Sequence, residues 1–369
     1  MAYELVEKLK QQYKESSGKW FGYNWHYVEG CILKAYLDSY EQTGNEEDYL
    51  FVKNFIDQLV DENGDVSQIN TDYYSIDQIR MTAILHTLYK KEKDERYKKP
   101  MDLIYNQLKT YPRTKTGNFW HKTNYPHQIW MDGLYMGQPF YVEYIKEFEE
   151  KKDYSDTLKQ FRNVRNLLFD EETQLYYHAY DESRDMFWAD KETGLSPHVW
   201  GRACGWFVMA LVDLLEMLEG EDVDTSEFKS LLTEAVDGML RYQHISGMWY
   251  QVVEYSGRKG NYLESSGTAM LAYAMLKGAR LGYLSADYIP FGKAAFDGII
   301  EQYVTEEDGE VLLGGICKSA GLGTHPELGI VRKGDYEYYI NGEPIVINNG
   351  HGVAPFLMAY NEIKQLASK

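Results

Sequence analysis

Apolar residues recur along this chain in two helical patterns. In segments such as 49–56 and 228–236 they fall on one face of a helix and charged residues fall on the other, which is typical of a helix at the protein surface. A second set of segments is apolar on most sides and often carries Gly or Ala, which indicates buried helices. The segments of this second set are 25–40, 75–89, 131–145, 200–218, 265–281 and 350–363. Surface and buried segments alternate along the chain.

Short aromatic or β-branched stretches, often opened by Gly, lie between the helical segments. Their spacing averages about 60 residues, roughly the length of two helices with their connections. These stretches are 18–21, 64–66, 117–121, 175–178, 247–250 and 309–312. The repeated unit is therefore an outer helix, a short strand-like stretch and an inner helix. A further hairpin is expected at 336–348, where Asn341 and Gly342 form a typical two-residue turn.

Repetition of this unit predicts an all-α fold, an (α/α)6 barrel with short β-hairpins in its loops. We expect residues 1–369 to form one catalytic domain, because no Pro-rich or Ser-rich linker interrupts the pattern, although the length alone also allows two or three domains. In a closed barrel, the loops that enter the inner helices converge on a central cavity. An open α-solenoid, which stacks the same helix pairs without closing, is the alternative.

Composition and charge argue against several classes of protein. A hydrophobic content of 44%, a charged content of 26% and a mean hydropathy of -0.51 are typical of a soluble globular chain. No uncharged apolar run approaches the roughly 18 residues of a membrane span, and the charged N-terminus lacks the apolar core of a signal peptide. We therefore expect a cytoplasmic protein without membrane contact. A net charge of -19 opposes nucleic-acid binding. The sequence does not determine the oligomeric state.

No sequence motif points to a metal or a cofactor. Cys31, Cys204 and Cys317 lie far apart and without paired spacing, so we predict buried free cysteines rather than disulfides or a zinc site. The chain has no phosphate-binding GxxxxGK, no HExxH and no nucleophile elbow. We therefore expect no cofactor and no metal.

The aromatic content indicates a sugar ligand. The chain holds 33 Tyr, 8 Trp and 14 Phe, together 15% of its residues, and many of them lie beside Gly, His and Asp rather than in apolar runs. Aromatic faces bury large areas while Tyr and Trp keep a polar group, which suits a cleft that binds carbohydrate.

Several polar and aromatic residues lie near the starts of the predicted inner helices, where they face the cavity together. They are Trp25, Asp77, His121, Asp132, His178, His198, Trp200, Arg202 and Trp206. Two carboxylates among histidine, arginine and tryptophan side chains are the groups that glycosidic-bond chemistry requires.

Many of these residues also have a purely structural interpretation. Asp77 and Asp132 can each be the N-cap of a helix. Asp132, however, lies in a strongly apolar context where an unpaired carboxylate is costly, which favours a functional role. His178 and His198 either contact a ligand or are hydrogen-bonded within the fold. Arg202 lies in an apolar helix, so its guanidinium needs a carboxylate from the protein or from a substrate.

Three segments carry motifs that are specific in combination: 130–140 (WMDGLYMGQPF), 196–206 (SPHVWGRACGW) and 262–270 (YLESSGTAM). With them the chain resembles, over nearly its whole length, the unsaturated rhamnogalacturonyl hydrolases of glycoside hydrolase family 105. The resemblance implies an (α/α)6 barrel that uses no metal. It also implies an unsaturated oligosaccharide substrate, from which the enzyme removes the 4,5-unsaturated galacturonic acid that lyases leave at the non-reducing end of pectin and rhamnogalacturonan.

The resemblance also implies roles for individual residues. It makes Asp132 the general acid and base, with Asp77 as its partner. It also implies that four residues line the subsite of the unsaturated sugar: His121, His178, Arg202 and Trp206. The match is weakest after Asp77, where residues 78–81 lack the Gly of the family pattern, so the role of Asp77 is less closely implied than that of Asp132.

The chemistry implied by this family is the hydration of a vinyl ether. A proton added at C4 of the double bond creates an oxocarbenium-like centre at C5, water adds there, and the resulting hemiketal collapses and releases the remaining sugar. Asp132 would donate the proton and then deprotonate the water. It must therefore stay neutral until the substrate is bound, and we expect burial among aromatic residues and the negative charge of Asp77 to favour the neutral form.

Other functions stay open at this point. An unsaturated glucuronyl hydrolase acting on glycosaminoglycan fragments shares the fold and the chemistry and differs in its substrate. A non-catalytic sugar-binding toroid keeps the aromatic cleft, but binding alone does not require an acid in an apolar pocket. A glycosidase or epimerase of saturated sugars is a third possibility.

Overall fold

The inner helices follow the predicted boundaries closely. The computed structural model describes residues 2–15, 22–325 and 329–368, so the aromatic stretch predicted at 18–21 lies outside the described residues. The inner helices are α2 (Tyr27–Thr43), α7 (Asp132–Phe148), α9 (Gly201–Met217), α11 (Ser265–Leu281), α13 (Gly350–Ala367) and one interrupted helix. The interrupted helix consists of the 3-10 turn η1 (Ile76–Gln78), α4 (Ile79–Thr82) and α5 (Ile84–Glu92).

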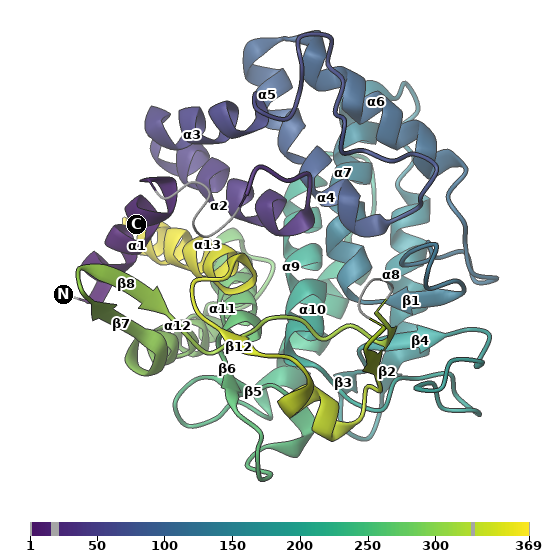
Figure 1. Ribbon diagram of the computed structural model, residues 1–369, viewed down its shortest axis with the longest axis vertical. Coiled ribbons are helices and arrows are strands. Elements are labelled where there is room, and N and C mark those ends of the chain that lie inside the picture. Colours follow the sequence, from purple (N-terminus) through teal and green to yellow (C-terminus); the bar gives the residue numbers. More distant parts are fainter. Residues whose placement is uncertain (1, 16–21, 326–328, 369) are drawn as a thin grey trace.

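The inner helices form a closed ring. Each packs against the next in the order α2, α4, α7, α9, α11, α13, and α13 then packs against α2. Figure 1 shows α13, in yellow, lying between α2, in purple, and α11, in green. An open solenoid would leave its first and last inner helices apart. The predicted all-α, six-hairpin toroid is therefore confirmed.

A second layer of helices surrounds this ring. Its members are α1 (Ala2–Glu15), α3 (Glu46–Ile56), α6 (Glu95–Lys109), α8 (Ser155–Leu168), α10 (Ser226–Leu240) and α12 (Ile289–Tyr303). Each contacts the inner helix beside it in the sequence, except that α1 contacts α13. In α10 the fully buried residues Phe228, Leu232 and Val236 recur every four positions, while Lys229 is exposed. One apolar face is thus enough to pack an outer helix against the inner ring, while its other face meets solvent.

Short antiparallel strand pairs lie in the loops. The pair that bears most on the cavity joins β1 (Gln128–Trp130) to β4 (Ala179–Asp181), with Ile129 opposite Tyr180. It ties the segment before α7 to the segment that follows His178. The other pairs are β2 (Phe169–Asp170) with β3 (Leu175–Tyr176), β5 (Trp249–Tyr250) with β6 (Leu263–Glu264), β7 (Val304–Glu307) with β8 (Glu310–Leu313), β9 (Ile316–Cys317) with β12 (Ile345–Val346), and β10 (Gly323–Thr324) with β11 (Val331–Arg332).

The hairpin predicted at 336–348 is wrong. Residues Tyr338–Gly342 form a π-helical turn, and β12 pairs with the distant β9 instead. The turn begins at Asp335, whose side chain accepts a hydrogen bond from the Tyr338 amide at 2.9 Å and whose carbonyl accepts one from the Tyr339 amide at 3.1 Å. The hairpin turn requires positive φ at both central residues, and neither Asn341 nor Gly342 has a positive φ.

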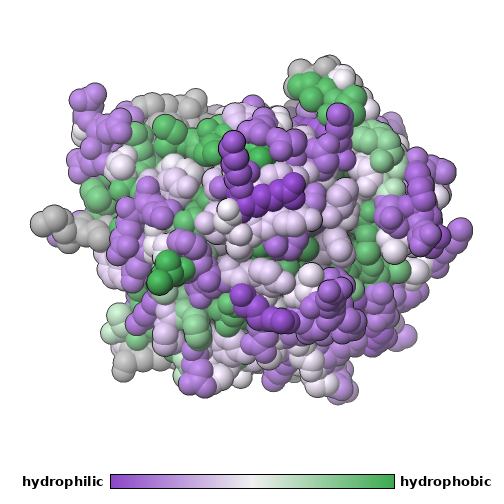
Figure 2. Space-filling view, turned by 90° about the horizontal axis from the view of Figure 1, so that it is seen from below, coloured by the Kyte–Doolittle hydropathy of each residue, from purple (hydrophilic) through white to green (hydrophobic). Residues whose placement is uncertain are grey.

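Within the described part of the chain, no helix combines the length and the apolar character needed to cross a bilayer. Figure 2 shows one face of the molecule, on which hydrophilic residues predominate and hydrophobic residues form small separate groups.

Gly267 permits α11 to approach the first turn of α9. A Cβ at this position would lie 2.8 Å from the Gly201 carbonyl carbon and 2.9 Å from the Arg202 amide nitrogen. Both are backbone atoms and cannot rotate away. The absence of a side chain at Gly267 therefore lets two neighbouring inner helices meet where Arg202 begins its helix.

We expect Gly267→Val to lower the free energy of unfolding by about 1–3 kcal/mol, because a larger side chain must push the two backbones apart. Chemical denaturation measures this change. The control is Ser230→Val on the exposed face of α10, which should change the free energy by less than about 0.5 kcal/mol. Equal stability of the two variants would contradict the close contact between α9 and α11.

Candidate active site

The loops that lead into the inner helices line a common cavity. Tyr27, Asp132 and His351 reach it from the first turns of α2, α7 and α13, and Asp77 reaches it from η1. The N-terminal ends of the inner helices therefore converge on one space, as expected for a toroid.

Asp132 is the first residue of α7 and is mostly buried. Its side chain is 15% exposed and lines the cavity. The N-cap of the helix is Met131, so Asp132 is not a capping residue. Its Oδ2 atom is buried without a hydrogen-bond partner among the described residues, and His178 Nε2 lies 3.5 Å from it. A carboxyl group with so few protein partners is available for chemistry with a ligand.

His178 is fully buried behind Asp132. Its Nδ1 atom lies 2.7 Å from the hydroxyl of Tyr339, which belongs to the π-helical turn. Its backbone carbonyl accepts a hydrogen bond from the Met131 amide at 3.2 Å. Backbone and side chain together hold the imidazole against the start of α7.

Asp77 forms an ion pair that the sequence did not suggest. Lys122 Nζ lies 2.6 Å from Asp77 Oδ2, and His121 Nε2 lies 3.9 Å from Oδ1. Burial alone would raise the pKa of Asp77, but the nearby Lys122 and His121 outweigh burial and lower it below its ordinary value. Asp77 is therefore ionised at neutral pH. Lys122 offsets its charge, so the repulsion between Asp77 and Asp132 is weaker than the sequence analysis assumed.

His121 is buried in the cavity wall against an aromatic residue. Its ring stacks on Trp130, with centroids 4.4 Å apart and planes 7° from parallel. Burial lowers the pKa of His121 to about 4, although the charge of Asp77 acts in the opposite direction. The imidazole is therefore neutral at pH values near 7.

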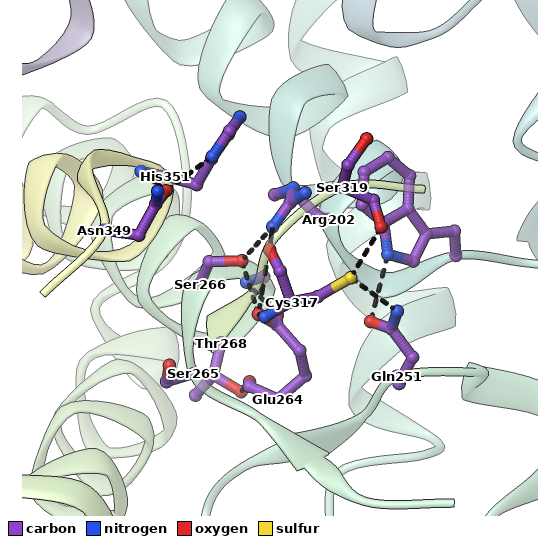
Figure 3. Close-up of polar contacts among 12 residues, drawn as sticks. Arg202, Gln251, Glu264, Ser265, Ser266, Thr268, Cys317, Ser319, Asn349 and His351 are labelled. Carbon is purple, nitrogen blue, oxygen red and sulfur yellow. Dashed lines mark hydrogen bonds and ion pairs between the residues drawn. The ribbon is translucent and has the colours of Figure 1, made fainter. Parts of the chain in front are cut away.

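Arg202 is anchored at the floor of the cavity. One of its guanidinium nitrogens donates to Ser266 Oγ at 3.0 Å and to the Cys317 carbonyl at 2.5 Å. Glu264, the N-cap of α11, accepts hydrogen bonds from the Ser266 hydroxyl at 2.6 Å and the Cys317 amide at 3.0 Å, and it lies 4.0 Å from Arg202. Figure 3 shows the guanidinium between these groups. The carboxylate partner predicted for Arg202 thus includes Glu264 of the protein itself.

Arg202 also packs against an aromatic wall. Its guanidinium carbon lies 4.4 Å from the ring centroid of Trp200, and Trp206 lines the same cavity. The Trp200 indole donates to Gln251 Oε1 at 3.0 Å, which fixes the ring. A planar ligand thus meets aromatic surface and a cation side by side.

Described residues between β8 and α13 line the cavity and include a second arginine. Arg332 lines the cavity, is 13% exposed, and pairs with Glu343 at 2.8 Å. Ser319 comes from the same segment.

His351 and Tyr27 complete the wall. The Tyr27 hydroxyl lies 2.6 Å from His351 Nε2, and Asn349 Oδ1 lies 2.7 Å from His351 Nδ1. Burial lowers the pKa of His351 well below its ordinary value, and the positive charge of Arg202 acts in the same direction. Like His121, this imidazole is neutral at pH values near 7.

The structure brings most of the sequence-predicted site residues together. Those on the cavity wall are Asp77, His121, Asp132, Trp200, Arg202 and Trp206. His178 lies directly behind Asp132. Trp25 and His198 are not among the described residues of the wall: the Trp25 amide donates to Gln68 at 2.8 Å, and His198 Nδ1 contacts Glu254 at 2.9 Å.

Sequence analysis missed several residues of the wall. Lys122 follows His121 directly, so its place next to a predicted site residue was a usable signal. Tyr27 and His351 open inner helices and were accessible by the same reasoning that found Asp132. Arg332 lies in irregular chain without helical periodicity, and no pattern in the sequence points to it.

The cysteines are small packing residues. Cys31, Cys204 and Cys317 are free and buried, as predicted. Among the residues that the structure describes, no cluster of three or more His, Cys, Asp or Glu side chains is arranged to hold a metal ion.

Comparison with known proteins places this architecture in a family. Residues 4–367 match the family described as Glycosyl Hydrolase Family 88. A solved glycoside hydrolase of family 105 from C. acetobutylicum is 40% identical, with 98% of this chain and 99% of that chain covered and a TM-score of 0.91. The chain belongs to glycoside hydrolase families 88 and 105. It is therefore a glycosidase, and its substrate is an oligosaccharide.

Two curated relatives are similar over much of the chain. Protein Atu3128 of Agrobacterium fabrum is 39% identical over 237 residues, which cover 63% of this chain and 100% of that protein. The unsaturated rhamnogalacturonyl hydrolase YesR of Bacillus subtilis is 26% identical over 293 residues, which cover 78% of each chain.

The buried histidines predict how stability depends on pH. The unfolded chain protonates His121 below its ordinary pKa of 6.5, whereas the folded chain keeps it neutral down to about 4. Protons then bind preferentially to the unfolded state. The contribution of His121 to the free energy of unfolding is therefore fully present above about pH 6.5, and it is lost progressively as the pH falls toward about 4. Between about pH 7 and about pH 5, His121 alone should lower the free energy of unfolding by about 2 kcal/mol.

Chemical denaturation of the wild type and His121→Phe at both pH values tests this. The phenyl ring keeps the stacking on Trp130 and removes the titration, so the variant should lose about 2 kcal/mol less than the wild type between the two pH values. His244→Phe, outside the cavity, is the control and should behave as the wild type. An unchanged pH dependence in His121→Phe would contradict a buried neutral His121.

Proposed function

We propose that this glycosidase removes the 4,5-unsaturated galacturonic acid from the non-reducing end of rhamnogalacturonan fragments by hydrating the C4=C5 double bond. The name of the relative YesR supports this substrate class. The observation that carries the mechanism is the unequal pairing of the two carboxylates. Asp77 is held by Lys122 at 2.6 Å, whereas Asp132 has no hydrogen-bonded protein partner among the described residues.

This inequality favours hydration over ordinary glycoside hydrolysis. Ordinary hydrolysis uses two carboxyl groups, one as the acid and the other as the base or nucleophile. An aspartate neutralised by a lysine is a poor base and a poor nucleophile. Asp132 is then the one carboxyl group of the pair that is free to exchange a proton. Addition of water to a vinyl ether needs one such group, which acts first as an acid and then as a base.

The proposed sequence balances protons and electrons. Asp132 transfers its proton to C4, the double-bond electrons form the new C–H bond, and positive charge develops at C5 and the ring oxygen. Water attacks C5 and gives a proton to the Asp132 carboxylate, which regenerates the acid. The hemiketal opens to a ketone at C5 and leaves a hemiacetal at C1, which expels the remaining sugar. One water is consumed and no covalent enzyme intermediate forms.

The surroundings of Asp132 suit a flat, anionic sugar. The double bond flattens the ring, and Trp200 and Trp206 offer aromatic surface beside Asp132. Arg202 is the cation we assign to the sugar carboxylate, because its guanidinium lies on the cavity wall next to Trp200. A chain of net charge -19 needs such a local cation to bind an anion.

The remainder of the substrate is proposed to occupy an adjoining cavity. This second cavity shares Ser319, Arg332 and His351 with the first, so the two cavities are direct neighbours. Its wall also includes Lys318 and Glu29, which offer a hydrogen-bond donor and an acceptor to sugar hydroxyls. The leaving sugar then lies between the segment that carries Arg332 and the N-terminus of α13.

The test is loss of the ultraviolet absorbance of the conjugated double bond when the purified enzyme meets unsaturated rhamnogalacturonan disaccharide. We expect absorbance loss with this substrate, and Asp132→Asn should reduce the rate by about 100-fold or more, because an amide cannot supply the proton. Asp222→Asn, at an exposed position, is the control and should keep the wild-type rate.

The same assay separates the alternatives. Faster absorbance loss with an unsaturated glucuronyl disaccharide from glycosaminoglycan would transfer the proposal to that substrate class. A flat trace with all unsaturated substrates, together with sugar binding, would favour a non-catalytic toroid. Near-normal turnover by Asp132→Asn would remove Asp132 from the mechanism.

A further inference from the structure

The imidazole of His178 is held in one orientation. It is fully buried, and its ring packs against Trp130 and Trp200 with centroid distances of 5.4 and 4.8 Å. Its Nδ1 atom faces the hydroxyl of Tyr339 at 2.7 Å, and its Nε2 atom faces Oδ2 of Asp132 at 3.5 Å. Neither Nε2 nor Oδ2 has a hydrogen-bond partner among the described residues, and the 3.5 Å between them is a close approach rather than a hydrogen bond.

Tyr339 is the polar neighbour of His178 Nδ1, so its hydroxyl bears on which nitrogen of the imidazole carries the hydrogen. Burial raises the pKa of Tyr339 well above its ordinary value, so the phenol keeps its hydrogen. The acceptor that the described structure offers to this hydroxyl is His178 Nδ1. When this hydroxyl donates to Nδ1, a neutral imidazole carries its hydrogen on Nε2, the nitrogen that lies nearest Asp132.

We propose that Tyr339 is a positioning residue that selects, through His178, which oxygen of Asp132 delivers the proton to the substrate. This inference rests on the proposed role of Asp132 as the acid. With a hydrogen on Nε2 of His178, 3.5 Å from Oδ2, the proton of the acid is disfavoured on Oδ2, and the transferable proton resides on Oδ1. Oδ2 is buried, whereas Oδ1 is not among the buried unpartnered atoms, so Oδ1 is the oxygen that faces the cavity.

The same arrangement serves both halves of the reaction. When Oδ1 gives its proton to C4, negative charge develops on the carboxylate, and the Nε2–H of His178 stabilises it at Oδ2. Oδ1 then takes a proton from the attacking water. Tyr339 and His178 keep their own protons throughout, so the cycle needs no further donor or acceptor.

The backbone around Tyr339 fixes this contact. Tyr339 lies in the π-helical turn that replaces the predicted hairpin, and such turns are frequent at functional sites. Its carbonyl accepts a hydrogen bond from Gln251 Nε2 at 3.2 Å, while Gln251 Oε1 accepts one from the Trp200 indole at 3.0 Å. The turn is thereby connected to the aromatic wall of the site, although Tyr339 is not among the described wall residues.

The first test reads the tautomer directly and needs no substrate. Nitrogen NMR of histidine-labelled wild-type protein near pH 7, with His178→Gln used to assign the signals, should show His178 protonated at Nε2 and unprotonated at Nδ1. A His178 that carries its hydrogen on Nδ1 would overturn the proposal. This result is independent of whether the proposed substrate is correct, and it needs no Tyr339 variant to fold.

The second test is kinetic. Tyr339→Phe keeps the ring but frees Nδ1, so His178 can adopt the other tautomer and lose its contact with Asp132. We expect kcat to fall about tenfold to a hundredfold while KM changes by less than about twofold, because Tyr339 does not line the cavity. In the NMR experiment, the variant should show a mixture of tautomers.

The matched control is Tyr336→Phe in the same segment. Tyr336 is also buried, and its hydroxyl donates to the backbone carbonyls of Arg258 and Lys259 rather than to a histidine. It should lower stability and keep kcat. A kcat of Tyr339→Phe within about twofold of the wild type would overturn the proposal. An equal fall in the kcat of both variants would also overturn it, because that result would indicate a general loosening of the segment.

Discussion

The buried carboxyl group of Asp132 is the constraint on which the rest of the site depends. The first residue of an α-helix commonly finds backbone amides or solvent to satisfy it. Asp132 is largely buried instead, and among the described residues its Oδ2 has no hydrogen-bond partner and faces an imidazole nitrogen at 3.5 Å. Holding it there requires α7 to begin at the cavity, the pairing of β1 with β4 to bring His178 behind it, and a distant turn to supply Tyr339. Elements from across the chain thus converge on one acid.

The charges around the cavity follow a common design. Each cation on the wall is held by the protein before any ligand binds: Lys122 by Asp77, Arg332 by Glu343, and Arg202 by Ser266 and the Cys317 carbonyl. Pre-positioned cations cost little reorganisation when an anionic sugar arrives. The neutral states of His121 and His351 keep further charge out of the wall, so the local field comes from a few fixed groups.

Helical periodicity was sufficient to predict the frame of this protein, but the details of the site depend on contacts that periodicity does not encode. The apolar segments ending near Ile145, Leu218 and Leu281 are inner helices because burial on all sides demands an apolar sequence. Asp132 and Arg202 were found because they open those helices. The pairing of Lys122 with Asp77, by contrast, depends on where a loop folds.

The segment after β8 shows where prediction from sequence fails. Asn341 and Gly342 are typical of a two-residue hairpin turn, and this local pattern predicted a hairpin over residues 336–348. Asp335 instead starts a helical turn, and β12 pairs with a strand nearly thirty residues earlier. Tyr339 and Arg332 owe their positions to this long-range pairing, so no local pattern could reveal that one supports the acid and the other lines the cavity.

The most direct test of the account is the fate of solvent hydrogen. Reaction of the unsaturated disaccharide in D2O, stopped within the first turnovers and analysed by NMR, should give a product with one deuterium at C4, because the acid protonates that carbon. The isolated product kept in D2O for the same time controls for slow exchange next to the ketone. Release of the second sugar while the freed uronic acid still carries its C4=C5 double bond would show that the enzyme protonates the glycosidic oxygen instead, and would contradict the account.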